Sequence, residues 1–189
     1  MSKKEKRNKK PVDLPAYRWA SRVVFLAIAL SAALSLVSET TLNGASVAVA
    51  ILILCLFILL GIVFDVIGVA VTAADVRPFH AMAAHKEKGA AEALRLLNNA
   101  SHVSSICNDV VGDICGIVSG TTAAVIVARL QDTFGIRTIF LSVAGTALIS
   151  GLTIGGKALG KTFAIERSTQ VVYTVGRFLH LFQGAFKRT

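Results

Sequence analysis

Acidic and amide side chains interrupt an otherwise apolar stretch of the chain, residues 104–120. Ser105, Asp109 and Asp113 recur at intervals of four and would share one face of a helix, with Asn108 on the neighbouring stripe. An ionised carboxylate at the centre of a membrane helix costs roughly 2.5–3.5 kcal/mol on insertion scales. The two aspartates are therefore expected to face a polar cavity or a protein partner, away from lipid.

Two other apolar stretches carry charges that could meet these residues. Asp65 lies near the end of one stretch, and Lys157 lies at the end of another. Carboxylate, amide and hydroxyl oxygens are the ligands that a hard cation such as Mg²⁺ prefers. Three aspartates against one lysine leave an imbalance that one divalent ion would neutralise. The same residues also predict an alternative, in which Lys157 pairs with one or two of the aspartates and no ion is needed.

The elements that must position these side chains are four apolar runs. Of the 189 residues, 54% are hydrophobic and only 16% are charged. A membrane-spanning helix needs about 20 predominantly apolar residues. The runs cover residues 20–37, 46–71, 103–128 and 138–156. This pattern predicts an all-α polytopic membrane protein with one membrane domain.

Two further segments are too charged to cross a membrane and have one apolar side each. Residues 78–99 form a weakly amphipathic helix or helix pair, broken near Gly89. From residue 161 to residue 188 the pattern predicts a long amphipathic helix with Val171, Val175 and Phe178 on its apolar side. Both segments are expected to lie at the membrane interface.

The positive charges flank the apolar runs and predict the orientation. Of the 20 Lys and Arg residues, 8 precede the first run or lie at its start, 4 follow the second run and 6 lie from Lys157 onward. These residues share one side if both termini are cytoplasmic, as the positive-inside rule requires. We therefore expect a multi-pass protein of the plasma membrane. The net charge of +9 is then a topology signal, and no nucleic-acid partner is expected.

The first run has a second interpretation, as a cleaved signal peptide, because a basic head before an apolar segment is also a signal's layout. Its basic head of about 22 residues is long for a signal peptide, and the cleavage site is weak. We therefore expect residues 1–19 to form a basic cytoplasmic tail. Residues 20–45 are expected to form an extra spanning helix with its connector.

Three short motifs lie at the ends of the remaining runs. The sequence from Phe64 reads F-D-V-I-G-V-A-V-T-A-A-D-V-R, that from Cys107 reads C-N-D-V-V-G-D, and that from Ile154 reads I-G-G-K-A-L-G-K-T. In order and spacing they resemble F-S-x-S-E-x-A, G-N-N-L-V-N and F-G-E-x-x-P-K-T of the CorB/CorC and cyclin-M magnesium transporters. Residues 46–189 thus resemble the membrane domain of that family (domain of unknown function 21).

The resemblance implies a homodimer with a three-helix core. Its spanning helices would hold a magnesium ion, reached from a cytoplasm-facing cavity belted by juxtamembrane helices. The ion's neighbours would be Asp65 and Ile67, at the positions of the family's two serines, with Asn108 and the backbone near Gly156. The family's glutamate is replaced by Lys157, a cation where the family has a ligand.

Other departures mark the chain as a divergent relative. Ile67 cannot ligate an ion with its side chain, and Gly160 replaces the family's proline. The nucleotide-sensing tandem domains (CBS pairs) that follow in many members are not expected here. From the residues and the resemblance together, the predicted cation ligands are Asp65, Ser105, Asn108, Asp109, Asp113 and Gly156, with Lys157 in a gating or ion-pairing role.

Enzymatic alternatives fit less well. An intramembrane aspartyl protease could use Asp65 and Asp113, but Val110 stands where the first glycine of G-x-G-D belongs. A zinc enzyme lacks the H-E-x-x-H pattern. No enzyme is therefore expected. The sequence predicts a divalent-cation transporter or transport-related protein of the lipid bilayer. The alternative is a non-transporting membrane protein that Lys157 locks and that binds an unidentified membrane partner.

Overall fold

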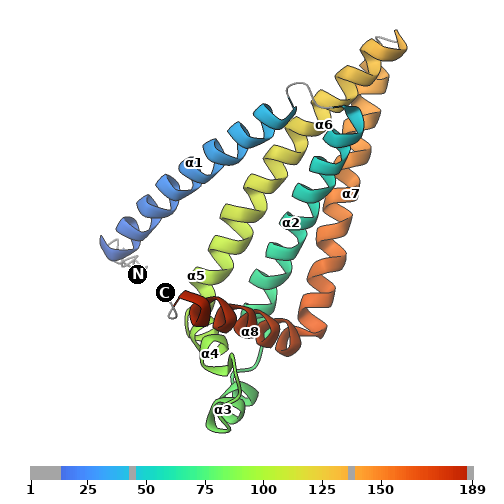
Figure 1. Ribbon diagram of the computed structural model, residues 1–189. Helices are drawn as coiled ribbons and strands as arrows, with labels where there is room; N and C mark the ends of the chain where they lie inside the picture. Colours follow the sequence, from blue (N-terminus) through green and yellow to red (C-terminus); the bar gives the residue numbers. More distant parts are fainter. Residues whose placement is uncertain (1–13, 43–45, 136–138, 187–189) are drawn as a thin grey trace, which may run out of the picture.

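The computed structural model describes residues 14–42, 46–135 and 139–186, and within these ranges the chain is all-helical (Figure 1). The helices in chain order are α1 (Leu14–Leu42), α2 (Val47–Ala73), α3 (Arg77–Ala84), α4 (Ala90–Asn98), α5 (Ala100–Ser105), the π-helix η1 (Ile106–Gly112), α6 (Asp113–Phe134), α7 (Ile139–Glu166) and α8 (Ser168–Phe186).

Four helical stretches are long and apolar enough to cross a membrane: Trp19–Thr40, Val47–Ala73, Ala100–Phe134 and Ser142–Glu166. They correspond to the four predicted runs and are compatible with an integral membrane protein. Successive stretches run in alternating directions, so α1 begins at the same end of the molecule at which α2 and α7 finish (Figure 1). We call this end, which also carries α3, α4 and α8, the foot.

The first helix is longer at both ends than its predicted apolar run. It begins at Leu14, inside the predicted basic tail, because Pro15 suits the first turn of a helix. It continues to Leu42, where Thr40 Oγ1 donates to the carbonyl oxygens of Leu36 (2.8 Å) and Val37 (3.1 Å). These bonds satisfy the Thr40 hydroxyl within the helix, so its donor is not left unpaired. Residues 1–13 of the predicted tail and 43–45 of the predicted connector lie outside the described residues.

The boundary between the last two helices also differs from the prediction. The helix α7 continues to Glu166, five residues past the expected start of the amphipathic segment at residue 161, and α8 begins at Ser168. Ala164 is fully buried against Ala70 of α2, which keeps the end of α7 packed on the bundle. The change of direction therefore falls at Arg167.

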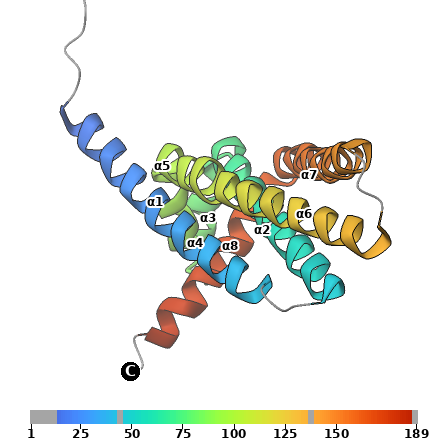
Figure 2. The ribbon, with the colours of Figure 1, turned by 90° about the horizontal axis from the view of Figure 1, so that it is seen from above.

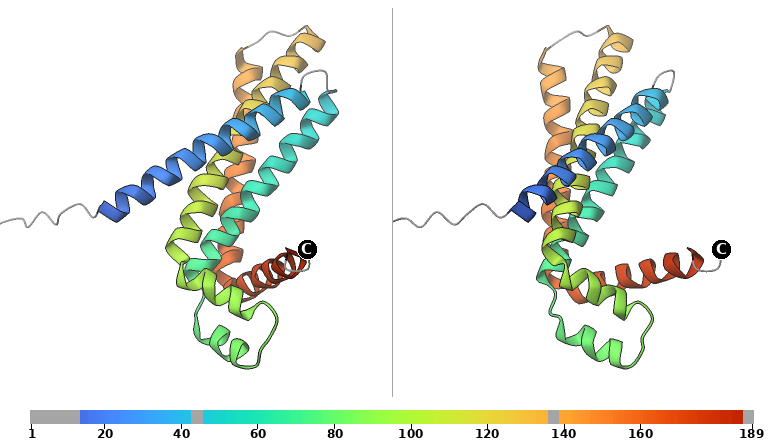
Figure 3. Two further views of the ribbon diagram at one scale, coloured as in Figure 1. Left: turned by 60° about the vertical axis from the view of Figure 1, so that its left-hand side comes forward. Right: turned by 90° about the vertical axis from the view of Figure 1, so that its left-hand side faces the viewer.

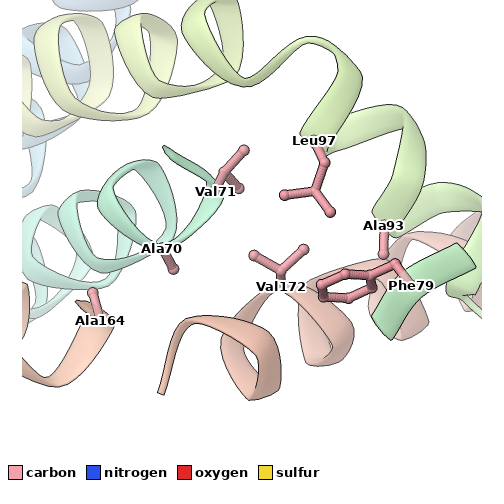
Figure 4. Packing of buried hydrophobic residues seen from close by; sticks show 7 residues of the cluster. All are labelled: Ala70, Val71, Phe79, Ala93, Leu97, Ala164 and Val172. Atoms are coloured by element: carbon pink, nitrogen blue, oxygen red, sulfur yellow. The ribbon is translucent and has the colours of Figure 1, made fainter. Parts of the chain in front are cut away.

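At the foot, a hydrophobic cluster joins α2, α3, α4, α7 and α8 (Figure 4). Its members are Ala70, Val71, Phe79, Ala93, Leu97, Ala164 and Val172. Phe79 and Val172 are fully buried, so the juxtamembrane helices form a packed layer under the spanning helices.

The predicted break near Gly89 is present, and it separates α3 from α4. Gly89 has φ of +90°, a conformation that favours glycine. A Cβ at Gly89 would also lie 2.6 Å from the Cα of Arg177, so the backbones of α4 and α8 are in contact there. Hydrogen bonds flank this crossing, from Tyr173 Oη to Glu87 Oε2 (3.2 Å) and between His180 Nδ1 and Glu92 Oε1 (3.0 Å).

The helix α8 lies across the foot, transverse to the standing bundle (Figure 3). Phe178, Leu181 and Phe182 of this helix are exposed. The helix α1 runs obliquely to the other spanning helices (Figures 2 and 3). It packs on α6 through a second cluster, and the hydroxyls of Ser38 and Thr122 lie 3.3 Å apart at this contact.

Candidate functional site

A carboxylate is buried at the centre of the contact between α2 and the following helices. Asp65 is only 3% exposed, although α2 is otherwise apolar. Gly61 and Gly68, one turn before and after Asp65, are buried on the same face. Gly61 packs on Cys115 and Gly68 packs on Asn108, so this face of α2 lies against η1 and α6.

Two lysines of α7 contact the Asp65 carboxylate from successive turns. Lys157 Nζ is 4.0 Å from Oδ1, and Lys161 Nζ is 3.6 Å from Oδ2. The Lys157 side chain is 20% exposed and that of Lys161 is 51% exposed, against 5% for Asp65. The pairing of Asp65 with Lys157 agrees with one of the two arrangements predicted from the sequence. Two ammonium groups facing one carboxylate leave a local charge of +1.

Lys157 has a second partner on the π-helix. Its Nζ donates to the carbonyl oxygen of Gly112, at 3.2 Å. A Cβ at Gly112 would lie 2.9 Å from Asp65 Oδ1 and 3.6 Å from Lys157 Nζ, so a side chain there would crowd the ion pair. Short π-helical segments are rare and are frequent at functional sites. The segment η1 brings Gly112 to this position.

One turn along the same contact, Asn108 carries a buried oxygen that lacks a partner. Its Nδ2 donates to Ser104 Oγ at 3.2 Å. Its Oδ1 is buried and has no hydrogen-bond partner among the described residues. The amide packs against Gly68, where a Cβ would overlap it. Gly68, which the amide contacts, follows Asp65 by three residues and so lies about 4.5 Å along the axis of α2 from it.

The other two predicted acids do not join this cluster. Asp109 and Asp113 are exposed in the protomer, and Ser105 Oγ donates to Asp109 Oδ2 at 2.7 Å. Their stripe lies beside the one that faces α2, so the expected convergence of three aspartates does not occur within one chain. Asp65 and Asp113, the pair a protease would need, face different surroundings. Within the described part of the chain, no three His, Cys, Asp or Glu residues are grouped as a metal site.

The remaining predicted neighbours of the ion have packing roles. A Cβ at Gly156 would lie 2.6 Å from Ile62 Cδ1, and one at Gly160 would lie 2.9 Å from Val66 Cγ2. These glycines let α7 approach α2 closely enough for Lys157 to reach Asp65. Ile67 is half-buried and packs against the hydrophobic cluster at the foot.

A cavity of about 240 Å³ lies between α6 and α7, with Lys157 among its lining residues. Polar side chains of α7 line this cavity, together with small residues of α6. The lining residues are Gly116, Ser119, Gly120, Ala123, Thr146, Ile149, Ser150, Thr153, Ile154 and Lys157. Lys157 therefore lies between the cavity and the buried carboxylate.

Sequence reasoning missed Lys161 as a partner of Asp65. The sequence feature that indicates this partner is the spacing of four residues between Lys157 and Lys161, which places both lysines on one face of a helix. The charge of Lys161 was instead assigned to the start of the amphipathic segment. Because α7 continues to Glu166, Lys161 still belongs to the spanning helix.

Comparisons of the chain with protein families, with curated proteins and with solved structures find no match in any of the three. The resemblance to the CorB/CorC and cyclin-M membrane domain stays a prediction from the motifs. The function is therefore argued from the geometry around Asp65.

Proposed function

We propose that the protein is an integral membrane protein that binds and moves divalent cations, in the manner of the CorB/CorC and cyclin-M transporters. The observation that carries the proposal is the buried Asn108 Oδ1, which has no hydrogen-bond partner among the described residues and packs on Gly68, three residues after buried Asp65 on the same face of α2. Leaving such an acceptor unsatisfied costs about 1–3 kcal/mol. A hard cation such as Mg²⁺ would supply the missing partner.

The set of oxygen atoms along this face of α2 suits such an ion. It contains a carboxylate, an amide oxygen and the carbonyl oxygen of Gly112, which are all oxygen ligands of the kind Mg²⁺ prefers. Two ammonium groups now contact the carboxylate, and an ion would have to displace at least Lys157. In this proposal Lys157 is a tethered cation that neutralises Asp65 whenever no metal ion is bound.

The position of Lys157 at the cavity supports a gating role. Its side chain is a flexible four-carbon stem ending in a compact charge. Rotation of this stem toward the cavity between α6 and α7 would release both Asp65 Oδ1 and the Gly112 carbonyl oxygen. The ion would enter from the foot, which we assign to the cytoplasm because most of the described Lys and Arg residues lie toward it.

The exposed acids support the homodimer that the family resemblance implies. Asp109 and Asp113 lie on a spanning stretch, where a carboxylate facing lipid costs roughly 2.5–3.5 kcal/mol. On the same face, a Cβ at Gly116 or Gly120, which also line the cavity between α6 and α7, would meet no atom within 4 Å. Small residues let helices of two protomers approach closely. A second copy packed on this face would shield the acids from lipid.

A second candidate is a non-transporting membrane protein whose site is locked. The contacts of Asp65 with Lys157 (4.0 Å) and Lys161 (3.6 Å) favour it, because the carboxylate is already neutralised. In this case the ion pairs hold α2 to α7, and the exposed acidic stripe binds a membrane partner.

The two candidates differ in their response to magnesium. The full chain in detergent would be titrated with Mg²⁺ while its thermal unfolding is followed, with Ca²⁺ and Na⁺ as controls. Transport predicts that Lys157→Met and Lys157→Glu strengthen the protection by Mg²⁺ and that adding Asp65→Asn abolishes it. Saturation at 100 times Kd is worth about 2.7 kcal/mol, or roughly 5–10 °C in Tm.

Liposomes loaded with a magnesium-sensitive dye would test movement of the ion directly. Lys161→Met is the matched control for both measurements, because Lys161 contacts Asp65 but does not line the cavity. If Mg²⁺ changes the stability of neither wild type nor the Lys157 variants, and no flux is seen, the transport proposal is wrong. The locked protein would then be the remaining candidate.

A further inference from the structure

An apolar groove of about 510 Å³ lies in the elbow where α8 turns away from α7 and passes beside α2. The α2 wall is formed by Ile62, Val63 and Val66, and the α8 wall by Val171 and Val175. No residue lines both this groove and the cavity beside Lys157. Its volume is in the range of pockets that hold small molecules, about 300–1,000 Å³.

The α8 side of the groove has a polar margin with a positioned cation. Gln170 and Thr174 contribute the polar atoms, and Thr174 Oγ1 donates to the Gln170 carbonyl oxygen at 2.8 Å. Arg167 Nη1 donates to Gln170 Oε1 at 3.2 Å. This hydrogen bond holds the guanidinium at the corner of the elbow, where α7 gives way to α8.

The surroundings of the elbow are cationic. Lys161, Arg167 and Arg177 are exposed on α7, at the bend and on α8, against the single exposed carboxylate of Glu166 in that stretch. The groove therefore combines an apolar wall along a spanning helix with a positively charged rim at the foot. A phospholipid with a negative headgroup has the complementary layout.

We propose that the elbow binds one acyl chain of an anionic phospholipid, with the headgroup phosphate on Arg167. The chain lies along Val63 and Val66 of α2, and its carbonyl end reaches the polar margin at Gln170. Water cannot fill such a groove favourably, because it would find too few hydrogen-bond partners there. An empty groove would lose dispersion contacts that a hydrocarbon chain supplies.

The guanidinium of Arg167 accounts for the proposed preference of the groove for the phosphate of an anionic phospholipid. Its planar fork presents paired N–H donors that match phosphate oxygens. The hydrogen bond to Gln170 restricts its rotamers before the lipid arrives. A lipid site here depends only on the membrane location of the four spans and not on cation transport.

The test uses the full chain in nanodiscs that contain a phosphatidylglycerol with a photoreactive acyl chain. Peptides labelled after illumination would be mapped by mass spectrometry. We expect labelling of residues 62–66 and 171–175, reduced at least fivefold by Val175→Trp, which fills the groove. Leu181→Trp is the matched control, because Leu181 is an exposed apolar residue of the same helix outside the groove. It should leave the labelling unchanged.

The headgroup is tested with Arg167→Gln and with phosphatidylcholine carrying the same photoreactive chain. We expect wild type to be labelled several times more by the anionic lipid and Arg167→Gln to be labelled equally by both. Circular dichroism checks the fold of each variant, and Val63→Trp replaces Val175→Trp if the latter unfolds.

Three results would overturn the proposal. Equal labelling of wild type and the groove-filling variants would show that the label comes from bulk membrane lipid and not from a lipid bound in the groove. Equal labelling by both lipids in wild type would show that Arg167 does not select an anionic headgroup, because phosphatidylcholine also carries a phosphate. Dissociation of a dimer by Val175→Trp, without labelling of wild type, would show that a second copy fills the groove.

Discussion

Removal of the Lys157 ammonium should lower the free energy of unfolding, because the buried Asp65 carboxylate then loses one of its two cationic partners. Lys157→Met keeps most of the side-chain length and removes the charge 4.0 Å from Asp65 Oδ1. At this distance and an effective dielectric constant of about 20, the attraction is about 4 kcal/mol. The substitution also removes the hydrogen bond to the Gly112 carbonyl oxygen.

The net loss should be smaller than that figure, because Asp65 keeps one partner. Lys161 Nζ remains 3.6 Å from Oδ2, although its half-exposed side chain is partly screened by solvent. Breaking a buried pair completely costs about 3–5 kcal/mol. We therefore expect Lys157→Met to lower the free energy of unfolding by about 2–3 kcal/mol. Lys161→Met, the control, should lower it by less than about 1 kcal/mol.

A double-mutant cycle with Asp65→Asn separates the ion pair from lost packing. In the Asp65→Asn background there is no buried charge to leave unpaired, so Lys157→Met should cost less than about 1 kcal/mol. The coupling energy is then about 2 kcal/mol, within the range found for residues in contact. Unfolding would be followed by circular dichroism in mixed detergent–SDS micelles without divalent cations. Effects that add within about 0.5 kcal/mol would refute the buried ion pair.

Three further predictions concern Gly68, Gly120 and Glu92. Gly68→Ala should displace the Asn108 amide and lower the free energy of unfolding by about 1–3 kcal/mol. The control is Gly155→Ala, whose Cβ meets no atom within 4 Å and which should be neutral or stabilising. Equal losses of stability in the same unfolding assay would contradict the close contact between Gly68 and Asn108. Gly120→Leu should shift a dimer toward monomer in light scattering, because the larger side chain would separate the two packed helices. Ala48→Leu, at an exposed position of α2, is the control. A dimer that Gly120→Leu leaves unchanged would place the interface elsewhere. The hydrogen bond from His180 lowers the pKa of Glu92 from its ordinary value of 4.5. The contact therefore stabilises the folded state fully above about pH 4.5, and its contribution is lost as the pH falls through the lowered pKa. Glu92→Gln should remove this acid-side loss in unfolding measured between about pH 3 and pH 6, and an unchanged profile would show that the contact contributes nothing.

The spanning helices were predictable because their signal is local. About twenty apolar residues in a row have few stable alternatives to a membrane helix, and Gly89 marked the break between α3 and α4. Helix ends were less predictable, since they depend on local bonding such as that of Thr40. The bend at Arg167 depends on the burial of Ala164 against α2, which a hydrophobic pattern does not contain.

The site was predictable only in part, for a geometric reason. Periodicity indicates which residues share a stripe, and it correctly separated the stripe of Asn108 from that of Asp109. It does not indicate which stripe faces a neighbouring helix, so Asp113 was wrongly expected beside Asp65 within one chain. The π-helical segment that presents the Gly112 carbonyl to Lys157 has no sequence pattern that we could recognise.

The backbone crossing of Gly89 and Gly176 has a consequence for the order of assembly. Gly89 directly precedes α4, and Gly176 belongs to α8, where a Cβ would lie 2.5 Å from the Gly89 carbonyl oxygen. The third and fourth spanning stretches lie between the two glycines in the chain. The crossing can form only after both stretches have been synthesised and inserted. The layer at the foot can therefore be completed only after α8 has been synthesised, and until then the faces of α3 and α4 that pack on α8 have no cover from α8.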